Sequence, residues 1–139
     1  MRGLTKFLLI ASVAAFFACL PFEGFCSSKE CIVSYGALLV GPLGLLGSPH
    51  EGLVWCANPL IFIAWFAVRS RSHWLAMAFG GVALYAATSF LFIQAVELDE
   101  SGNLYPITGY EAGYWLWLVS VVLVCAASVS LLVQQKSVH

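Results

Sequence analysis

The feature that most constrains this chain is a long apolar stretch without charge over residues 113–133, GYWLWLVSVVLVCAASVSLLV. As a helix, a stretch of this length is about long enough to cross a bilayer core of roughly 30 Å. Three further apolar stretches have similar lengths, and hydrophobic residues make up 61% of the 139-residue chain. A soluble domain of this size has too little interior to hide so much apolar surface. The sequence therefore predicts a single all-α membrane domain over residues 1–139.

Four membrane-spanning helices are expected. They cover residues 7–22, 52–70, 74–96 and 113–133. Arg2 and Lys6 precede the first of them, and a basic start before an apolar run is typical of a signal peptide or of a first membrane helix. Because Phe16 and Phe17 fit the cleavage signals poorly, we favour an uncleaved helix.

The segments between the spans are unequal in length. Residues 23–51 are predicted to form an outer segment, and residues 97–112 an outer loop. Within that loop, residues 99–103 are typical of a turn, and the residues on its far side, 104–107, favour a short β-hairpin. Within the outer segment, residues 32–47 are apolar and rich in glycine, so they either cross the membrane or fold back at its surface.

Small residues recur at helical spacing in two places. They are Ser34, Ala37, Gly41, Gly44 and Ser48 in the outer segment, and Ala76, Gly80, Ala83 and Ala87 in the third span. Such a stripe lets membrane helices approach one another closely. In the outer segment, the Gly41-Pro42 pair is expected to bend or break the helix.

The charged residues decide how many spans there are and how they are oriented. If residues 32–47 do not cross, the basic residues other than Lys29 all fall on one side and every acidic residue falls on the other. These basic residues are Arg2, Lys6, Arg69, Arg71 and Lys136. If residues 32–47 do cross, the basic residues divide between the two sides. The positive-inside rule therefore favours four spans with both termini in the cytoplasm of a bacterial inner membrane.

Four of the five cysteines fall near the outer boundary of the predicted membrane domain. In an oxidising compartment two disulfides are possible, with Cys26–Cys31 and Cys19–Cys56 as the local choice, although spacing alone does not fix the connectivity. One interpretation is a redox pair of a membrane thiol oxidoreductase. Because no Cys-x-x-Cys motif is present, we favour the other, a structural bridge that closes an outer loop. Cys125 is expected to be a small core residue.

Asn58 and Pro59 lie inside the second predicted span, where proline is expected to kink the helix. Asn58 must find a hydrogen-bond partner there. The pair marks either a ligand or ion site at the kink or a bend held by an interhelical hydrogen bond, and we favour the bend. The candidate partners are Gln94, Thr88, Ser89 and Ser120.

Several functional classes have no support in the sequence. No Asp, Glu, Lys or Arg lies deep in any span, which argues against a proton-coupled transporter. Phosphate-loop, nucleophile-elbow and zinc-binding patterns are missing from the sequence, and basic residues are too few for nucleic-acid binding. No catalytic residue, metal or cofactor is therefore predicted.

Four motifs together touch most of the chain. They are residues 19–26 (CLPFEGFC), 35–41 (YGALLVG), 57–59 (ANP) and 107–117 (ITGYEAGYWLW). In these the sequence resembles a group of small, uncharacterised bacterial four-helix membrane proteins. The resemblance implies a shared fold with a structured outer face and implies no activity. In size and expected topology the chain is also similar to immunity proteins that guard the inner membrane against pore-forming toxins, a likeness of shape alone.

The function expected from these features is protein binding at the outer face, without catalysis. An immunity protein against a membrane-targeting toxin is its most concrete form. The residues expected at the contact surface are Glu97, Asp99, Glu100, Tyr105, Tyr110 and Glu111. The alternatives are a thiol-disulfide oxidoreductase that uses Cys26 and Cys31, and a structural subunit of a larger membrane complex. The bilayer is an expected partner in each case, and a homo-oligomer is compatible with all three.

Overall fold

The computed structural model describes residues 2–99 and 101–139 and consists mostly of helix. The helices are α1 (Gly3–Cys19), α2 (Ser34–Val40), α3 (Gly44–Gly47), α4 (Pro49–Trp55), α5 (Ala57–Arg69), α6 (His73–Ser89) and α7 (Ala112–Lys136), with 3₁₀ turns η1 (Gly41–Leu43) and η2 (Phe90–Phe92). The strands are β1 (Glu23–Ser27), β2 (Cys31–Val33), β3 (Ala95–Glu97) and β4 (Leu104–Tyr110).

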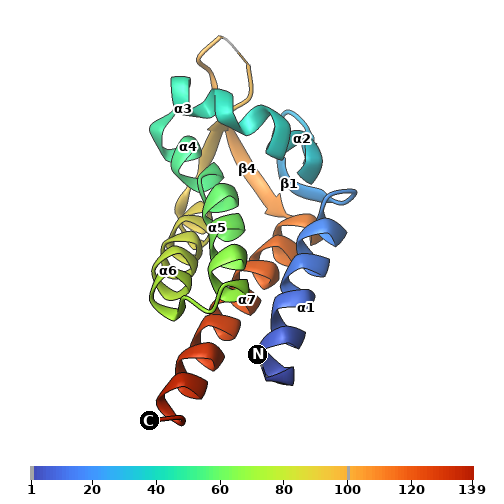
Figure 1. Cartoon of the computed structure of the whole chain (residues 1–139). Helices are drawn as coiled ribbons and strands as arrows, with labels where there is room; N and C mark the ends of the chain where they lie inside the picture. Colours follow the sequence, from blue (N-terminus) through green and yellow to red (C-terminus); the bar gives the residue numbers. More distant parts are fainter. Residues whose placement is uncertain (1, 100) are drawn as a thin grey trace.

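The four long helices α1, α5, α6 and α7 form a bundle (Figure 1). Helix α7 packs along α1 on one side and along α6 on the other, and α5 packs on α6. Both termini and the α5–α6 turn lie at one end of this bundle, and the strands and helices α2–α4 lie at the other end (Figure 1). We call these the terminal end and the sheet end.

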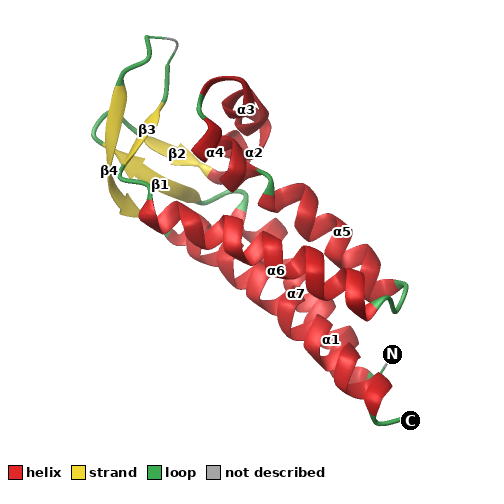
Figure 2. Cartoon of the chain, turned by 90° about the vertical axis from the view of Figure 1, so that its left-hand side faces the viewer, coloured by secondary structure: helices red, strands yellow, loops and turns green. Residues whose placement is uncertain are grey.

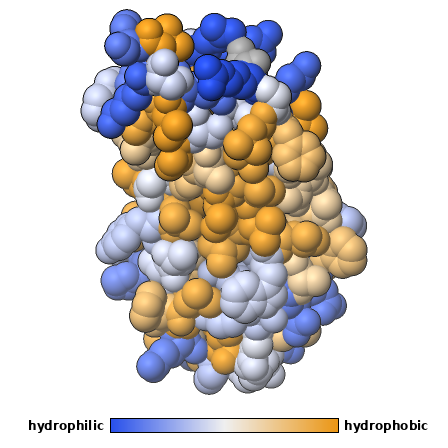
Figure 3. Space-filling view, turned by 90° about the horizontal axis from the view of Figure 1, so that it is seen from below, coloured by the Kyte–Doolittle hydropathy of each residue, from blue (hydrophilic) through white to orange (hydrophobic). Residues whose placement is uncertain are grey.

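Three helical segments are long and apolar enough to cross a membrane: Pro49–Arg69, His73–Phe92 and Ala112–Lys136. Helix α1 is apolar too, but at 17 residues it is shorter, as is the segment Ser34–Gly47. Many large apolar side chains of the bundle are exposed, and in Figure 3 they form an orange band between more hydrophilic ends. Such a surface suits a lipid environment rather than water.

The boundaries of two predicted spans are corrected by the structure. The first helix begins at Gly3 and ends at Cys19, whereas residues 7–22 were expected. The third, expected to continue to residue 96, ends with η2 at Phe92, because the chain there turns into strand β3. The fourth expected span lies wholly within α7.

The four strands form one antiparallel sheet in the order β2-β1-β4-β3 (Figure 2). The expected hairpin in the outer loop is confirmed, since β3 pairs with β4. The expectation of an all-α protein is wrong for residues 23–33, where β1 and β2 form a second hairpin. Strand β1 pairs with β4 across about 80 residues of sequence, a long-range contact that no local pattern indicates.

The second predicted span is interrupted one turn before Pro59. Helix α4 ends at Trp55, and α5 begins at Ala57. Pro59 has no N–H to donate to the carbonyl of Trp55, four residues earlier, so the regular helical bonding is interrupted there.

The small residues of the third span lie where α6 meets its neighbours. Ala76, Gly80, Ala83 and Ala87 are all buried, and Gly80 approaches Cys125 of α7. The thiol of Cys125 donates to the backbone oxygen of Gly80 at 3.1 Å. The prediction that this stripe lets helices approach closely is confirmed, and Cys125 is a packing residue as expected.

Candidate functional site

A cluster of aromatic side chains packs the sheet against the sheet end of the bundle. Phe90 packs against Phe25 of β1 at 5.1 Å and against Tyr110 of β4 at 5.4 Å between ring centroids. Tyr110 in turn packs against Tyr114 of α7 at 5.0 Å. The Tyr110 hydroxyl donates to the Phe90 carbonyl at 2.9 Å, and the Tyr114 hydroxyl donates to the Ala87 carbonyl at 3.0 Å. Sheet and helices therefore form one packed unit.

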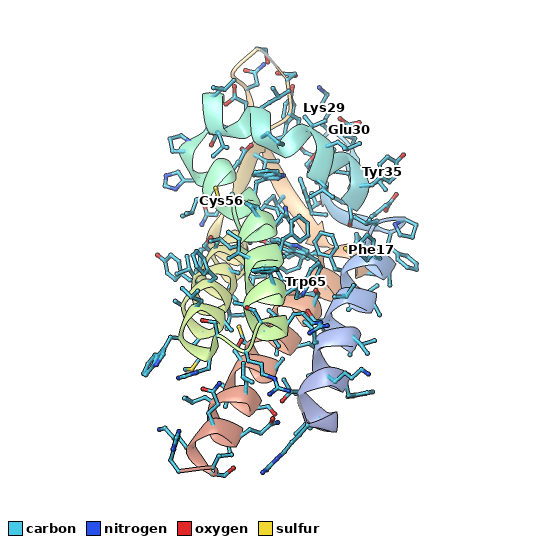
Figure 4. The ribbon with its side chains drawn as sticks, in the orientation of Figure 1. Phe17, Lys29, Glu30, Tyr35, Cys56 and Trp65 are labelled. Atoms are coloured by element: carbon cyan, nitrogen blue, oxygen red, sulfur yellow. A yellow bond between two sulfur atoms is a disulfide. The ribbon has the colours of Figure 1, made fainter. Side chains whose placement is uncertain are left out.

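A charged cluster joins the two hairpins. Lys29, in the β1–β2 turn, forms an ion pair with Asp99 at 3.0 Å, and the Tyr105 hydroxyl donates to the same carboxylate at 2.6 Å. The Ser101 hydroxyl also bonds to Asp99. Figure 4 shows Lys29 beside the loop between β3 and β4. The only basic residue expected outside thus neutralises one of the acidic residues.

The same contacts shift the pKa values in this cluster. Hydrogen bonds from Ser101, Tyr105 and Lys29 hold the pKa of Asp99 well below its usual range. The Asp99 carboxylate raises the pKa of Tyr105 and that of Lys29, because it stabilises the protonated form of each. Over the neutral range the cluster therefore stays as an ionised acid held by three donors.

The other predicted contact residues differ in their solvent exposure and in their hydrogen bonds. Glu111 is exposed, whereas Glu97 is half-buried and its backbone N–H donates to the Glu51 carboxylate at 2.7 Å. The Tyr110 hydroxyl already has a partner within the aromatic cluster, and burial raises the pKa of this phenol. Glu100 lies outside the described residues.

Cys26 and Cys31 form a disulfide that closes the β1–β2 hairpin. The predicted second bridge is absent from the described residues: Cys19 and Cys56 are both free. Cys19 is buried, and its thiol donates to the Phe16 carbonyl of its own helix. Glu23 lies close to the disulfide, but oxidised sulfurs are not thiolates, so these three residues do not form a metal site.

A cavity of about 820 Å³ lies between the sheet and the short helices α2–α4. In Figure 2 the sheet and these helices stand on opposite sides of the bundle's upper end. Most of the lining is apolar, with contributions from Leu38, Val54, Phe90 and Trp117. Its polar lining includes Asn58 and the acidic residues Glu30, Glu51, Glu97 and Asp99. Sequence analysis missed this cavity because its walls come from segments distant in sequence.

Asn58 is the buried polar side chain of this cavity. It is 7% exposed, and its Oδ1 accepts from the Trp117 indole N–H at 2.8 Å. The predicted interhelical bond is thus confirmed, with a partner that was not among the candidates. Thr88 and Ser89 bond to carbonyls of their own helix, and Ser120 bonds to α1. Trp117 was missed because it lies 59 residues from Asn58 in the sequence and only the packing of α5 on α7 brings the two together.

Together the apolar helices and the strand-built end define a helical membrane protein with three candidate spans. Comparisons with known protein families, with curated proteins and with solved structures each find no match to this chain.

Proposed function

We propose that this chain is a non-enzymatic four-span protein of the bacterial inner membrane that binds a protein partner through its sheet end. In this proposal α1 is the fourth span, and both termini are cytoplasmic. An immunity protein against a membrane-targeting toxin is the most concrete form of this role.

The observation that carries the proposal is the separation of charge between the two ends. Arg2 and Lys6 begin α1, Arg69 and Arg71 lie at the α5–α6 turn, and Lys136 ends α7. Within residues 2–99 and 101–139, the acidic residues belong to the sheet end, and Lys29 is the Lys or Arg residue found among them. This polarity is the one that the positive-inside rule favours for a cytoplasmic terminal end. The exposed acidic groups then face outward, where they attract a basic partner surface.

The structure narrows the residues that suit such a contact. Asp99 and Tyr105 are bonded to one another, and Tyr110 is bonded within the aromatic cluster, so these side chains shape the sheet end. The carboxylates of Glu23, Glu30 and Glu111 are exposed and belong to β1, the β1–β2 turn and the start of α7. We place the centre of the contact surface on these groups and on Glu97.

The test is affinity capture of the tagged chain from crosslinked native membranes, followed by mass spectrometry. A single stoichiometric partner is expected, and the charge reversals Glu23→Lys and Glu111→Lys together should abolish its capture. Lys136→Glu at the terminal end is the matched control and should leave capture unchanged. Capture that survives both reversals in a folded chain would exclude the sheet end as the contact surface.

The disulfide is compatible with one alternative, a thiol-disulfide oxidoreductase that uses Cys26 and Cys31, as well as with a structural bridge. This alternative predicts that Cys26→Ser accumulates reduced proteins in the periplasm and that thiol-linked partners are trapped on Cys31. Wild-type behaviour of the Cys26→Ser/Cys31→Ser variant in a disulfide-formation assay would exclude it. A structural subunit of a larger complex would instead be unstable when isolated in detergent.

A further inference from the structure

The wall of the cavity at the sheet end contains a hydrogen-bond donor without an acceptor in the described part of the chain. Asn58 Oδ1 faces the Trp117 indole, which is a donor only, so the amide nitrogen points the other way. Among the described residues no acceptor meets this nitrogen, yet no fully buried side-chain nitrogen or oxygen there lacks a partner. Asn58 is 7% exposed and lines the cavity, so its amide nitrogen opens into that space.

The surroundings of the cavity point to an apolar ligand. Its volume of about 820 Å³ lies within the usual size range of small-molecule sites. Large side chains of α2 and η1 that line it remain uncovered: Tyr35 is 55% exposed, Val40 60% and Leu43 63%. Apolar groups gathered in this way need a cover other than water. In a membrane protein, lipid provides that cover.

Asn58 lies at a depth that suits the polar part of a lipid chain. Gln135, near the terminal end of α7, donates to the carbonyl of Arg71 in the α5–α6 turn. From Gln135 to Trp117 the helix rises about 27 Å, which is nearly the roughly 30 Å thickness of a hydrocarbon core. The Trp117–Asn58 pair therefore lies near the far edge of that core, which is the boundary with the lipid headgroup region.

Beyond this edge the cavity becomes acidic. Glu51 lies two turns before Asn58 along α4 and α5, and Glu97 lines the cavity from β3. Asp99 lines it too, but its charge is already paired with Lys29. The Glu51 carboxylate accepts one hydrogen bond, from the Glu97 backbone. Carboxylates at this point complement a cationic headgroup and disfavour an anionic one.

We propose that the cavity binds a phospholipid with a primary amine headgroup, such as phosphatidylethanolamine. One acyl chain leaves the hydrocarbon core at the level of Asn58 and occupies the apolar space between the sheet and α2–α4. The ester carbonyl of that chain accepts from the Asn58 amide, and the ammonium group faces Glu51 and Glu97. The site shares Glu30 and Glu97 with the proposed protein contact, whereas Glu23 and Glu111 lie outside its lining, and lipid binding does not depend on that contact.

The test uses the full chain in vesicles of phosphatidylethanolamine and phosphatidylglycerol. A phosphatidylethanolamine probe with a photoactivatable group on its acyl chain is titrated in, and adducts are mapped by mass spectrometry. A saturable adduct on cavity-lining peptides of α2–α4 is expected, and the equivalent phosphatidylglycerol probe should label these peptides more weakly. Labelling that rises linearly with probe and spreads over all helices would overturn the proposal on the wild-type chain alone.

Variants then separate the two polar contacts. Asn58→Leu should lower the saturable adduct about fivefold, as expected for one lost hydrogen bond. Thr88→Val changes a polar side chain of α6 outside the cavity lining, so it is the control and the adduct should persist. Glu51→Gln should remove the preference for phosphatidylethanolamine, since the amide oxygen still accepts from Glu97 but carries no charge. An unchanged adduct in a folded Asn58→Leu chain would contradict the site.

Discussion

At the scale of the residue, Gly41 and Trp55 decide how the short helices fold back. The Trp55 indole donates to the Leu38 carbonyl at 2.9 Å, and a Cβ built on Gly41 would overlap the indole ring. Only hydrogen fits between the backbone of η1 and this ring. Gly41, which the sequence predicts to break the helix, therefore also allows the Trp55 ring to pack directly on the backbone.

We expect Gly41→Ala to displace the Trp55 ring and to lower the free energy of unfolding by about 1–3 kcal/mol, which is typical of overpacking. Gly36→Ala is the matched control, since a Cβ at Gly36 has no neighbour within 4 Å. It should be neutral or slightly stabilising. Unfolding in detergent, followed by tryptophan fluorescence, measures both. Equal stability of the two variants would show that the Gly41 contact contributes nothing.

The Asp99 cluster gives a pH dependence at the same scale. The ionised carboxylate raises the pKa of Tyr105, so Asp99→Asn should return that pKa towards the ordinary value of about 10. Titration of the labelled Tyr105 ring by NMR measures this. Glu111→Gln, outside the cluster, is the control and should leave the titration unchanged.

The sign of the effect on stability follows from the same bonds. The pKa of Asp99 is lowered on folding, so its contribution is present above its unfolded pKa and is lost as pH falls through the folded value. The raised pKa of Tyr105 gives a contribution that is lost as pH rises through it. The loop between β3 and β4 should be best ordered between these limits. Amide exchange that shows no loss of order in strong acid would contradict this.

At the scale of the element, a polar clamp joins α1, α5 and α7. The Ser12 hydroxyl donates to the Ser120 carbonyl at 2.7 Å, and the Ser120 hydroxyl donates to the Ser12 carbonyl at 2.7 Å. The Trp65 indole also donates to the Ser12 hydroxyl at 2.9 Å. Figure 4 shows Trp65 directed from α5 towards α1. Three helices therefore meet at one serine.

Ser12→Ala should destabilise the bundle by about 1 kcal/mol, because bonds between membrane helices contribute roughly 0.6 to 2 kcal/mol each. The Trp65 indole also loses its acceptor. Thr88→Ala is the control, because Thr88 bonds only within its own helix, to Leu84 and Tyr85. Unfolding in mixed micelles gives both values. A larger loss for Thr88→Ala would show that the clamp does not hold the helices together.

At the scale of the whole molecule, the testable feature is which end faces which side of the membrane. With Cys19, Cys56 and Cys125 replaced by alanine, single cysteines are placed at Asn103 and Ser137, both exposed. Asn103→Cys at the sheet end should react with an impermeant maleimide in intact cells. Ser137→Cys should react only after the membrane is opened. The reverse pattern would place the termini outside and contradict the proposed orientation.

The sequence by itself determined the membrane class, the long helices, the small-residue stripe of α6 and the β3–β4 hairpin. These features depend on contacts between near neighbours or on contact with lipid, and each leaves a local pattern of apolar length, helical spacing or turn residues. The interruption before Pro59 belongs to this group, since it involves residues only a few positions apart. The Cys26–Cys31 bridge was the local choice, but the spacing of the cysteines did not fix it.

Only the tertiary structure decided the pairing of β1 with β4, the free state of Cys19 and Cys56, and the partner of Asn58. The same is true of the cavity at the sheet end, whose walls come from the sheet, from α2–α4 and from the bundle. Each depends on segments far apart in the chain that meet only after packing. The pattern of apolar and polar residues shows which residues are buried but not which segment they pack against, so it does not specify these contacts.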